Sequence, residues 1–142
     1  MPATANAVRL HCVDLRGRSI VDRRLVLPPR PVTDSVYDAL IAIFSRAPGR
    51  TEADLRNRIH RPRDLPVVLG MMLDNGGLVW LQRSHRFEST ARWLRLRPDG
   101  TPHDSVTFPN AYRILRSDGD TLWAARADSN GLESLERCTV PR

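Results

Sequence analysis

Arginine is the residue type of this chain whose number and spacing could do chemistry. All 22 basic residues are arginines, and the densest basic stretch, residues 83–97, holds five arginines and one acid, Glu88. A guanidinium group is planar, always charged, and matches a phosphate or a carboxylate with two parallel hydrogen bonds. Together with the formal net charge of +6 at pH 7, these arginines predict that the protein associates with polyanions.

Two groups of arginines are candidates for phosphate contacts. The first group lies next to Trp93 in the sequence, and arginines beside an aromatic ring suit phosphate binding and stacking on a base. The alternative is a solvent-exposed strand face on which the aromatic ring packs under the aliphatic parts of the arginines. The second surrounds a predicted turn, where its members either contact phosphates or pair with Glu52, Asp54 and Asp64. The first group contains Arg92, Trp93 and Arg95, and the second contains Arg56, Arg58, Arg61 and Arg63.

The sequence predicts a binding protein and not an enzyme, with no catalytic, metal or cofactor site. The two cysteines, Cys12 and Cys138, lie near opposite ends of the chain, lack metal-ligand spacing and are expected to be free thiols. Ser84 and His85 are neighbours, but no carboxylate at a suitable spacing could orient the imidazole. No glycine-rich loop is followed by the Lys and Ser or Thr that a phosphate-cradling loop needs.

The elements that must position these arginines follow from hydrophobic periodicity. Residues 8–27 alternate between apolar and polar types on both sides of Gly17, which predicts a β-hairpin. The PPRP segment at 28–31 is a stiff connector, because proline restricts its own backbone and that of its neighbour. Capped apolar spacing predicts three helices, near residues 35–46, 51–60 and 64–75. Strands are predicted over 78–83, over 91–97 and on both sides of residues 118–119. Residues 132–140 fit a last strand or a short helix, and the strand is favoured; no internal repeat is visible.

Three segments of the sequence resemble the winged-helix family. The segment "TEADLRNRIHRPRDLPVVL" is similar to the family's capped helix, tight turn and third helix, "MLDNGGLVWL" to the start of its wing, and "QRSHRFESTARWLRL" to a wing hairpin. The resemblance covers residues 33–97 and implies an α+β fold, a winged helix-turn-helix core flanked by N-terminal and C-terminal β-hairpins. The expected units are residues 1–31 (hairpin and proline-rich connector), 32–100 (winged helix) and 101–142 (β-rich extension).

The resemblance also implies binding to nucleic acid or to protein, since winged helices do both. By position, the third helix would present Arg61 and Arg63 at its start, and the wing would present Arg83, His85, Arg86 and Arg92. The outward face of that helix departs from the family pattern, because it is apolar and cannot donate to the atoms that distinguish base pairs. We therefore expect protein to cover this face, which comprises Val67, Val68 and Met71.

These observations predict a nucleic-acid-binding protein that contacts the phosphate backbone with weak sequence preference. Duplex DNA is favoured and RNA is not excluded. The alternative is a protein-interaction or dimerisation module, such as an adaptor subunit of a nucleoprotein complex, and a protein partner or a homodimer is expected in either case. The longest apolar run, residues 65–73, is too short to cross a bilayer, and the first residues lack the pattern of a signal peptide. A cytoplasmic location without membrane contact is therefore expected.

Overall fold

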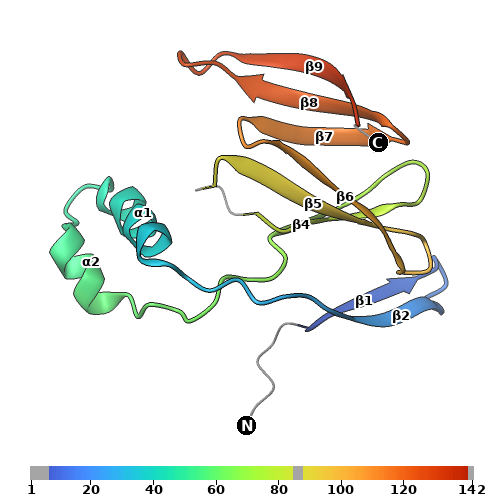
Figure 1. The fold of residues 1–142 in the computed structure, drawn as a ribbon, viewed down its shortest axis with the longest axis horizontal. Coiled ribbons are helices and arrows are strands. Elements are labelled where there is room, and N and C mark those ends of the chain that lie inside the picture. Colours follow the sequence, from blue (N-terminus) through green and yellow to red (C-terminus); the bar gives the residue numbers. More distant parts are fainter. Residues whose placement is uncertain (1–6, 85–87, 141–142) are drawn as a thin grey trace, which may run out of the picture.

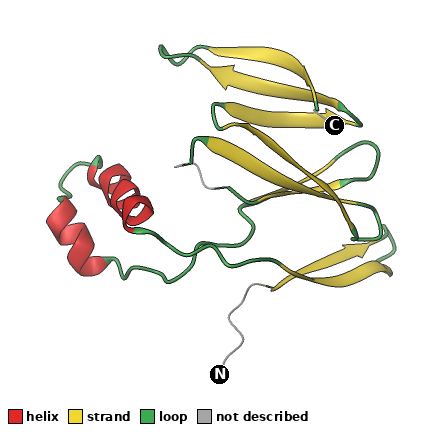
Figure 2. Cartoon of the chain, viewed as in Figure 1, coloured by secondary structure: helices red, strands yellow, loops and turns green. Residues whose placement is uncertain are grey.

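The computed structural model describes residues 7–84 and 88–140, and β-strands predominate in this part of the chain. Figure 1 shows three antiparallel sheets as successive layers with a pair of helices beside them, and Figure 2 shows how much of the fold is strand. No helix in the described ranges is long and apolar enough to cross a membrane. The elements are β1 (Ala7–Val13), β2 (Ser19–Val26), α1 (Asp34–Ser45), α2 (Glu52–Arg58), β3 (Gly70–Leu73), β4 (Val79–Gln82), β5 (Thr90–Leu96), β6 (Pro102–Pro109), β7 (Tyr112–Asp118), β8 (Thr121–Ala127) and β9 (Glu133–Thr139).

The first layer is the predicted N-terminal hairpin, in which β1 pairs with β2. Its turn contains Gly17 with a φ of 75°, a left-handed conformation that costs glycine little. The alternating pattern places Leu10 and Leu25 on the buried face, while Arg9 and Asp22 form an ion pair on the outer face. This pairing confirms the predicted hairpin. Its register is fixed by the buried face, because a shift of one residue would move Leu10 or Leu25 to the solvent side.

The second layer, the four-stranded sheet β3-β4-β5-β6, is buried on both faces. On one face, Val79, Leu81 and Leu96 pack against Leu10 and Leu25 of the hairpin. Since successive residues of a strand point to opposite faces, the residues between them point to the other side. The central sheet therefore needs a covering layer on each face.

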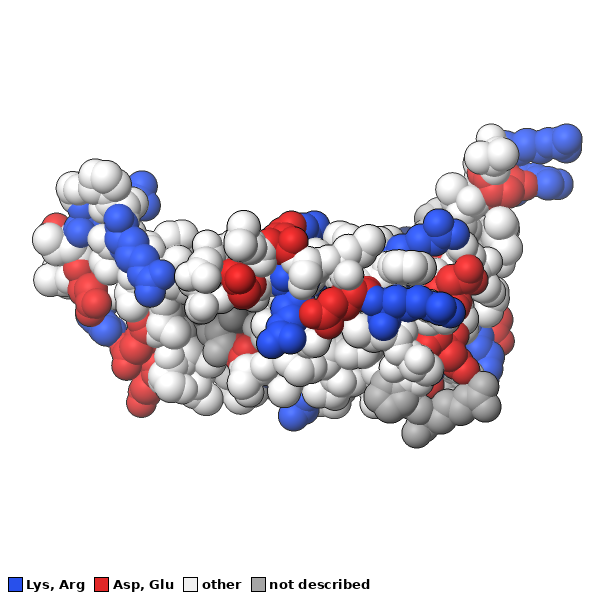
Figure 3. All heavy atoms as spheres, turned by 90° about the horizontal axis from the view of Figure 1, so that it is seen from above, with Lys and Arg blue, Asp and Glu red and all other residues white. Residues whose placement is uncertain are grey.

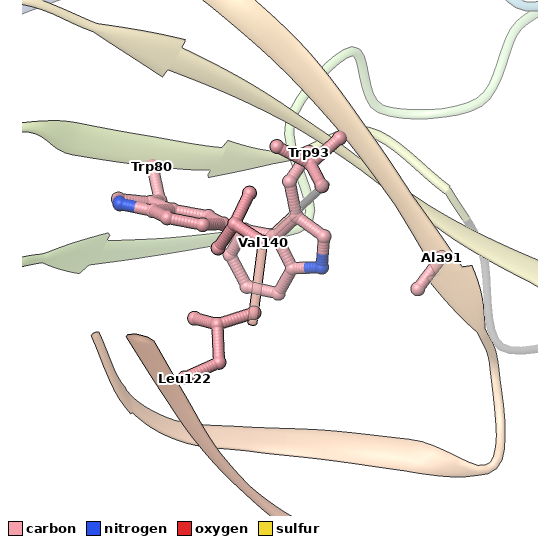
Figure 4. Packing of buried hydrophobic residues seen from close by; sticks show 6 residues of the cluster. Trp80, Ala91, Trp93, Leu122 and Val140 are labelled. Carbon is pink, nitrogen blue, oxygen red and sulfur yellow. The ribbon is translucent and has the colours of Figure 1, made fainter. Parts of the chain in front are cut away.

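The opposite face of this sheet packs against the third layer, β7-β8-β9. Trp80 of β4 is completely buried, and its ring meets that of Trp93 on β5 edge to face, with centroids 6.2 Å apart. Figure 4 shows both rings beside Leu122 of β8 and Val140. Because aromatic side chains dominate core energetics, this cluster holds the second and third layers together.

The two helices begin where the sequence predicts them. Thr33 caps α1 by accepting a hydrogen bond from the Val36 N–H, and Thr51 caps α2 in the same way at the Asp54 N–H. Each cap satisfies one of the N–H groups that a helix start leaves without an intrahelical partner. The first two predicted helices are therefore confirmed.

The two helices lie in the chain between β2 and β3, and the segments on either side of the pair are hydrogen-bonded to each other. The Val32 N–H donates to the Arg63 carbonyl at 3.0 Å, and the Leu65 N–H donates to the Arg30 carbonyl at 2.7 Å. These bonds tie the outgoing chain to the returning chain. As a result, they fix the connector that follows β2 against the segment that precedes β3.

The predicted third helix is wrong, and with it the winged-helix core and the α+β class. Residues 64–69 are irregular, and β3 follows and pairs with β4. The apolar run of residues 65–73 fits a helix or a strand by periodicity alone, while Gly70 and two neighbouring valines disfavour a helix. The strand prevails because pairing with β4 satisfies backbone groups of both strands.

The strands of the predicted wing exist, but they belong to the larger sheet. β4 and β5 pair antiparallel, as predicted for residues 78–83 and 91–97, and β5 pairs on its other side with β6. In the C-terminal part, β7 and β8 meet around residues 118–119, and β9 covers the last predicted strand. The individual strands are confirmed, whereas their assignment to a winged helix is not.

The strand register reveals a repeat that the sequence does not show. In the central sheet, Trp80 of β4 stands opposite Arg95 of β5. In the C-terminal sheet, Trp123 of β8 stands opposite Arg137 of β9. The same cross-strand pair thus recurs in both sheets, but Trp80 and Arg95 are buried whereas Trp123 is 38% exposed and Arg137 is exposed. Over the described residues, the central sheet has in addition a fourth strand, β6, next to β5.

Arg95 is a charged residue inside the interface between the second and third layers. Its side chain is 3% exposed and lies over the Trp80 ring, with Cζ 5.0 Å from the ring centroid. Its Nε and Nη2 donate to the two carboxylate oxygens of Asp104 on β6. The hydrogen bonds of this pair raise the pKa of Arg95 and lower the pKa of Asp104, so each partner stabilises the charged form of the other.

We expect Asp104→Ala to lower the free energy of unfolding by about 2–4 kcal/mol, because it leaves a buried guanidinium group without its partner. Arg95→Met removes the buried charge and keeps most of the volume, so it should cost about 1 kcal/mol or less. Urea unfolding of both variants measures the two values. A larger loss for Arg95→Met than for Asp104→Ala would contradict this account of the pair.

Candidate anion-binding cleft

A cleft of about 600 Å³ lies where the proline-rich connector meets the central sheet. Its walls come from connector residues 28–30, from the segments that follow β4 and precede β5, and from the neighbouring strands β5 and β6. Its charged lining carries an excess of positive charge, since it comprises three arginines and one glutamate: Arg30, Arg83, Arg92 and Glu88.

The surroundings of Arg30 fix its position in the cleft. Prolines on both sides restrict its backbone, and its carbonyl accepts the Leu65 N–H. Its side chain is 19% exposed; one terminal nitrogen, Nη2, contacts the Glu88 carboxylate, whereas the other, Nη1, is buried without a hydrogen-bond partner among the described residues. Because an unsatisfied buried donor is costly, Nη1 has much to gain from a ligand.

Arg83 and Arg92 are neighbours across the β4 and β5 pair. The Arg83 N–H donates to the Arg92 carbonyl, and the Arg92 N–H donates to Oγ of buried Ser84, both at 2.8 Å. The Arg83 side chain holds the connector, since Nη2 donates to the Pro28 carbonyl at 2.9 Å and Nε donates to the Val67 carbonyl at 3.3 Å. Arg92 is exposed, and its side chain has no hydrogen bond or ion pair with another described residue.

The electrostatics of the cleft favour an anion. The pKa of Arg30 is lowered because its side chain is buried and because Arg83 and Arg92 repel its charge. Burial also lowers the pKa of Arg83. Arginine stays protonated despite such shifts, so the cleft holds poorly solvated, mutually repelling positive charges, and a bound oxyanion would relieve both penalties.

The arginines predicted around the helical turn do not line this cleft. Arg56 pairs with Asp38 at 2.8 Å, and its Cζ lies 5.7 Å from the centroid of the Tyr37 ring. Arg61 pairs with Asp34 at 2.5 Å. For these two arginines the structure favours ion pairing with neighbouring acids. Arg63 contacts Asp64 at 3.9 Å, as the ion-pairing alternative predicts. Arg58 is exposed.

The arginines predicted on the wing separate into two sets. Arg83 and Arg92 come together in the cleft, whereas Arg95 points into the core and pairs with Asp104. Trp93 borders the cleft, but its ring packs in the core against Trp80. The pattern of arginines beside an aromatic residue therefore reflects core packing at Trp93 and Arg95. The predicted residues His85 and Arg86 lie outside the described residues.

The residues predicted to contact a protein do not share a helix face. Val67 and Val68 are half-buried in the segment before β3, and Val68 packs against the core between the hairpin and the central sheet. Met71 lies on β3 and is 69% exposed. The chain itself thus covers part of this apolar run, and of the three residues Met71 alone is largely at the surface.

Arg30 is the cleft residue that the sequence analysis does not single out. Its signal is the PPRP segment, since an arginine between prolines has a backbone that cannot rearrange to find a partner. Three guanidinium groups around one cleft can bind an anion through charge-assisted hydrogen bonds. Within the described ranges, no group of three or more histidine, cysteine or acidic side chains is placed to hold a metal ion.

Comparison of the chain with protein-family models, with curated proteins and with solved structures gives no match. The winged-helix resemblance of residues 33–97 therefore receives no support from related proteins, just as it receives none from the fold. The function has to be argued from the cleft and from the surfaces of this chain.

We expect Arg83→Met to lower the free energy of unfolding by about 1–3 kcal/mol, because the Pro28 and Val67 carbonyls lose a charged donor. Arg92→Met should change it by about 0.5 kcal/mol or less, because the exposed Arg92 side chain holds no other described residue in place. Urea unfolding checks both values. Equal effects of the two substitutions would show that Arg83 does not anchor the connector.

Proposed function

We propose that this protein binds a phosphate group in the cleft lined by Arg30, Arg83 and Arg92. The observation that carries the proposal is Nη1 of Arg30, a buried donor without a partner in the described structure, beside two further guanidinium groups. A phosphate has several acceptor oxygens and a negative charge, so one group could satisfy this donor and neutralise the repulsion between the arginines. The side chain of Arg83 is already bonded to Pro28 of the connector and to Val67. Arg92 is exposed and has no side-chain partner among the described residues, so it is available to a ligand.

Nucleic acid is one source of such a phosphate, and a small phosphate ester is the other. The net charge of +6 supports nucleic acid as the partner. On the face that Figure 3 shows, basic side chains are interspersed with acidic ones, so this face supports contact with a single phosphate more than a long track along a backbone. In this proposal the protein acts in the cytoplasm as a binding protein, with weak sequence preference and without catalysis.

Protein binding is the second candidate function. Met71 and Leu73 on β3 are each 69% exposed at the edge of the central sheet. Neighbouring apolar side chains at a surface favour a protein contact. This observation supports the predicted interaction module, now with the exposed side chains of β3 in place of a helix face.

The decisive comparison for phosphate binding is between Arg92→Ala and Arg24→Ala. Both substitutions remove one exposed arginine, but Arg24 lies on the hairpin and does not line the cleft. Calorimetric titration with inorganic phosphate, a short DNA duplex and a short single-stranded RNA should show an affinity loss of about ten-fold for Arg92→Ala. Arg24→Ala should cost about two-fold or less, because salt screens exposed charges that do not touch the ligand.

Salt dependence separates a direct contact from general attraction. On the duplex, Arg92→Ala should reduce the slope of log K against log salt by about 0.9, the value for one lost phosphate contact. Equal losses for Arg92→Ala and Arg24→Ala would assign binding to net charge and not to the cleft. A wild-type protein that binds none of the three ligands at low salt would reject phosphate binding and favour the protein contact at β3.

Glu88→Gln should have the opposite effect on phosphate affinity. Glu88 is the acidic side chain in the cleft lining and contacts Arg30, so it competes with an incoming anion for the same guanidinium group. Its neutralisation should tighten the binding of inorganic phosphate about ten-fold, because charges at close range interact strongly in a partly buried site. Unchanged or weaker binding of phosphate to Glu88→Gln would show that the anion does not reach Arg30.

A further inference from the structure

The C-terminal sheet has three described strands, and the central sheet, which contains the same cross-strand pair of tryptophan and arginine, has four. The matching pairs of tryptophan and arginine place β8 at the position of β4 and β9 at the position of β5. In the central sheet, β6 then pairs with the free side of β5. In the C-terminal sheet, β9 is an edge, and Figure 1 shows it at the outer border of the molecule.

The central sheet indicates which side chains a fourth strand should bring. Asp104 of β6 stands opposite Arg95, and Val106 stands opposite Trp93. The acid neutralises the arginine, and the valine is 3% exposed. The segment of β6 that completes β5 therefore has the sequence acid, Ser, apolar residue, since residues 104–106 are Asp-Ser-Val.

The corresponding positions on β9 are Arg137 and Leu135. Arg137 is exposed and its side chain has no hydrogen bond or ion pair within the described residues. Leu135 is 64% exposed. The edge of β9 thus presents an exposed arginine and an exposed leucine at the positions where β5 has Arg95 and Trp93, which β6 supplies with an acidic and an apolar neighbour.

β9 itself carries the sequence that meets these requirements. Residues 133–135 are Glu-Ser-Leu, the same order of acid, serine and apolar residue as in β6. When two copies of β9 pair antiparallel about Leu135, Leu135 faces Leu135, and Arg137 of each copy faces Glu133 of the other. Directly opposed residues of antiparallel strands lie on the same face, so the two ion pairs and the leucine pair form together.

The edge of β9 also lacks the features that block pairing at the other edges of the two larger sheets. β3 has only four residues, and β6 has a proline at each end. β7 carries a bulge between Ile114 and Arg116. β9, in contrast, has seven residues, pairs regularly with β8 and contains no proline. β9 does carry charged side chains, which usually block an edge against association. In an antiparallel pair of two β9 strands, however, Glu133 and Arg137 become complementary, so these charges favour pairing with a second copy in one register.

We infer that two copies of this chain associate through antiparallel pairing of β9 with β9, centred on Leu135. The contact is isologous, because each copy contributes the same surface, and it joins the two C-terminal sheets into one sheet of six strands. Glu133 exchanges its exposed ion pair with Arg113 of its own chain, at 3.0 Å, for Arg137 of the second copy. None of these residues lines the arginine cleft, so the association is independent of phosphate binding.

Charge exchange between positions 133 and 137 tests this inference. Sedimentation equilibrium of the wild type over a range of concentrations should show a monomer–dimer equilibrium. Arg137→Glu places Glu opposite Glu, and Glu133→Arg places Arg opposite Arg, so each should weaken dimerisation about ten-fold or more. The double variant Glu133→Arg/Arg137→Glu should restore it, and the two single variants should form a mixed dimer with each other.

A matched control and a fold check complete the experiment. Arg116→Glu makes the same charge change on β7, at the opposite edge of the C-terminal sheet from β9, and should leave the dissociation constant within about two-fold, since screened distant charges contribute little. Circular dichroism melting should show that all variants fold. A wild type that stays monomeric at millimolar concentration would overturn the inference. So would a dimer that Arg137→Glu leaves intact, or one that the double variant fails to restore.

Discussion

A sheet with two apolar faces has to be covered on both sides, and the central sheet imposes this condition on the rest of the chain. Val79, Trp80 and Leu81 are consecutive and all buried, although consecutive strand residues point in opposite directions. The N-terminal hairpin covers the side of Val79 and Leu81, and the C-terminal sheet covers the side of Trp80. The helix pair takes no part in these two cores and projects beside them (Figure 1).

The charged features follow from the same layering. The connector that leaves the hairpin passes the central sheet on its way to the helices, which brings Arg30 to Arg83 and Arg92. Arg95, by contrast, is enclosed between two layers, where Asp104 of the neighbouring strand compensates its charge. Three buried side-chain atoms of the described residues have no hydrogen-bond partner: Nη1 of Arg30, Nε1 of Trp93 and Oγ of Ser117. Nη1 of Arg30 differs from the other two because it belongs to a charged group with two further arginines beside it, and this combination supports the phosphate-binding proposal.

The local elements could be predicted because their signals are local. Thr33 and Thr51 cap helices by their own side chains, and Gly17 permits the turn whose flanks alternate. Of the three arginines in the cleft, Arg83 and Arg92 could be predicted because they lie in the basic stretch of residues 83–97. Arg30 could not be predicted with them, because it lies far from that stretch in the sequence. Arg95 has the same residue type and spacing as a surface arginine, so its burial could not be inferred from its neighbours in the chain.

The sequence by itself determined the helix caps, the turns and most of the strands, because hydrogen bonds and backbone preferences within a few residues decide them. Tertiary structure alone decided that residues 70–73 form β3, since their apolar run has no period that separates helix from strand and pairing with β4 settles the choice. It also decided which arginines meet and which strand stays at an edge. These outcomes depend on contacts between segments far apart in the chain, and the free energy of such contacts cannot be inferred from a few neighbouring residues.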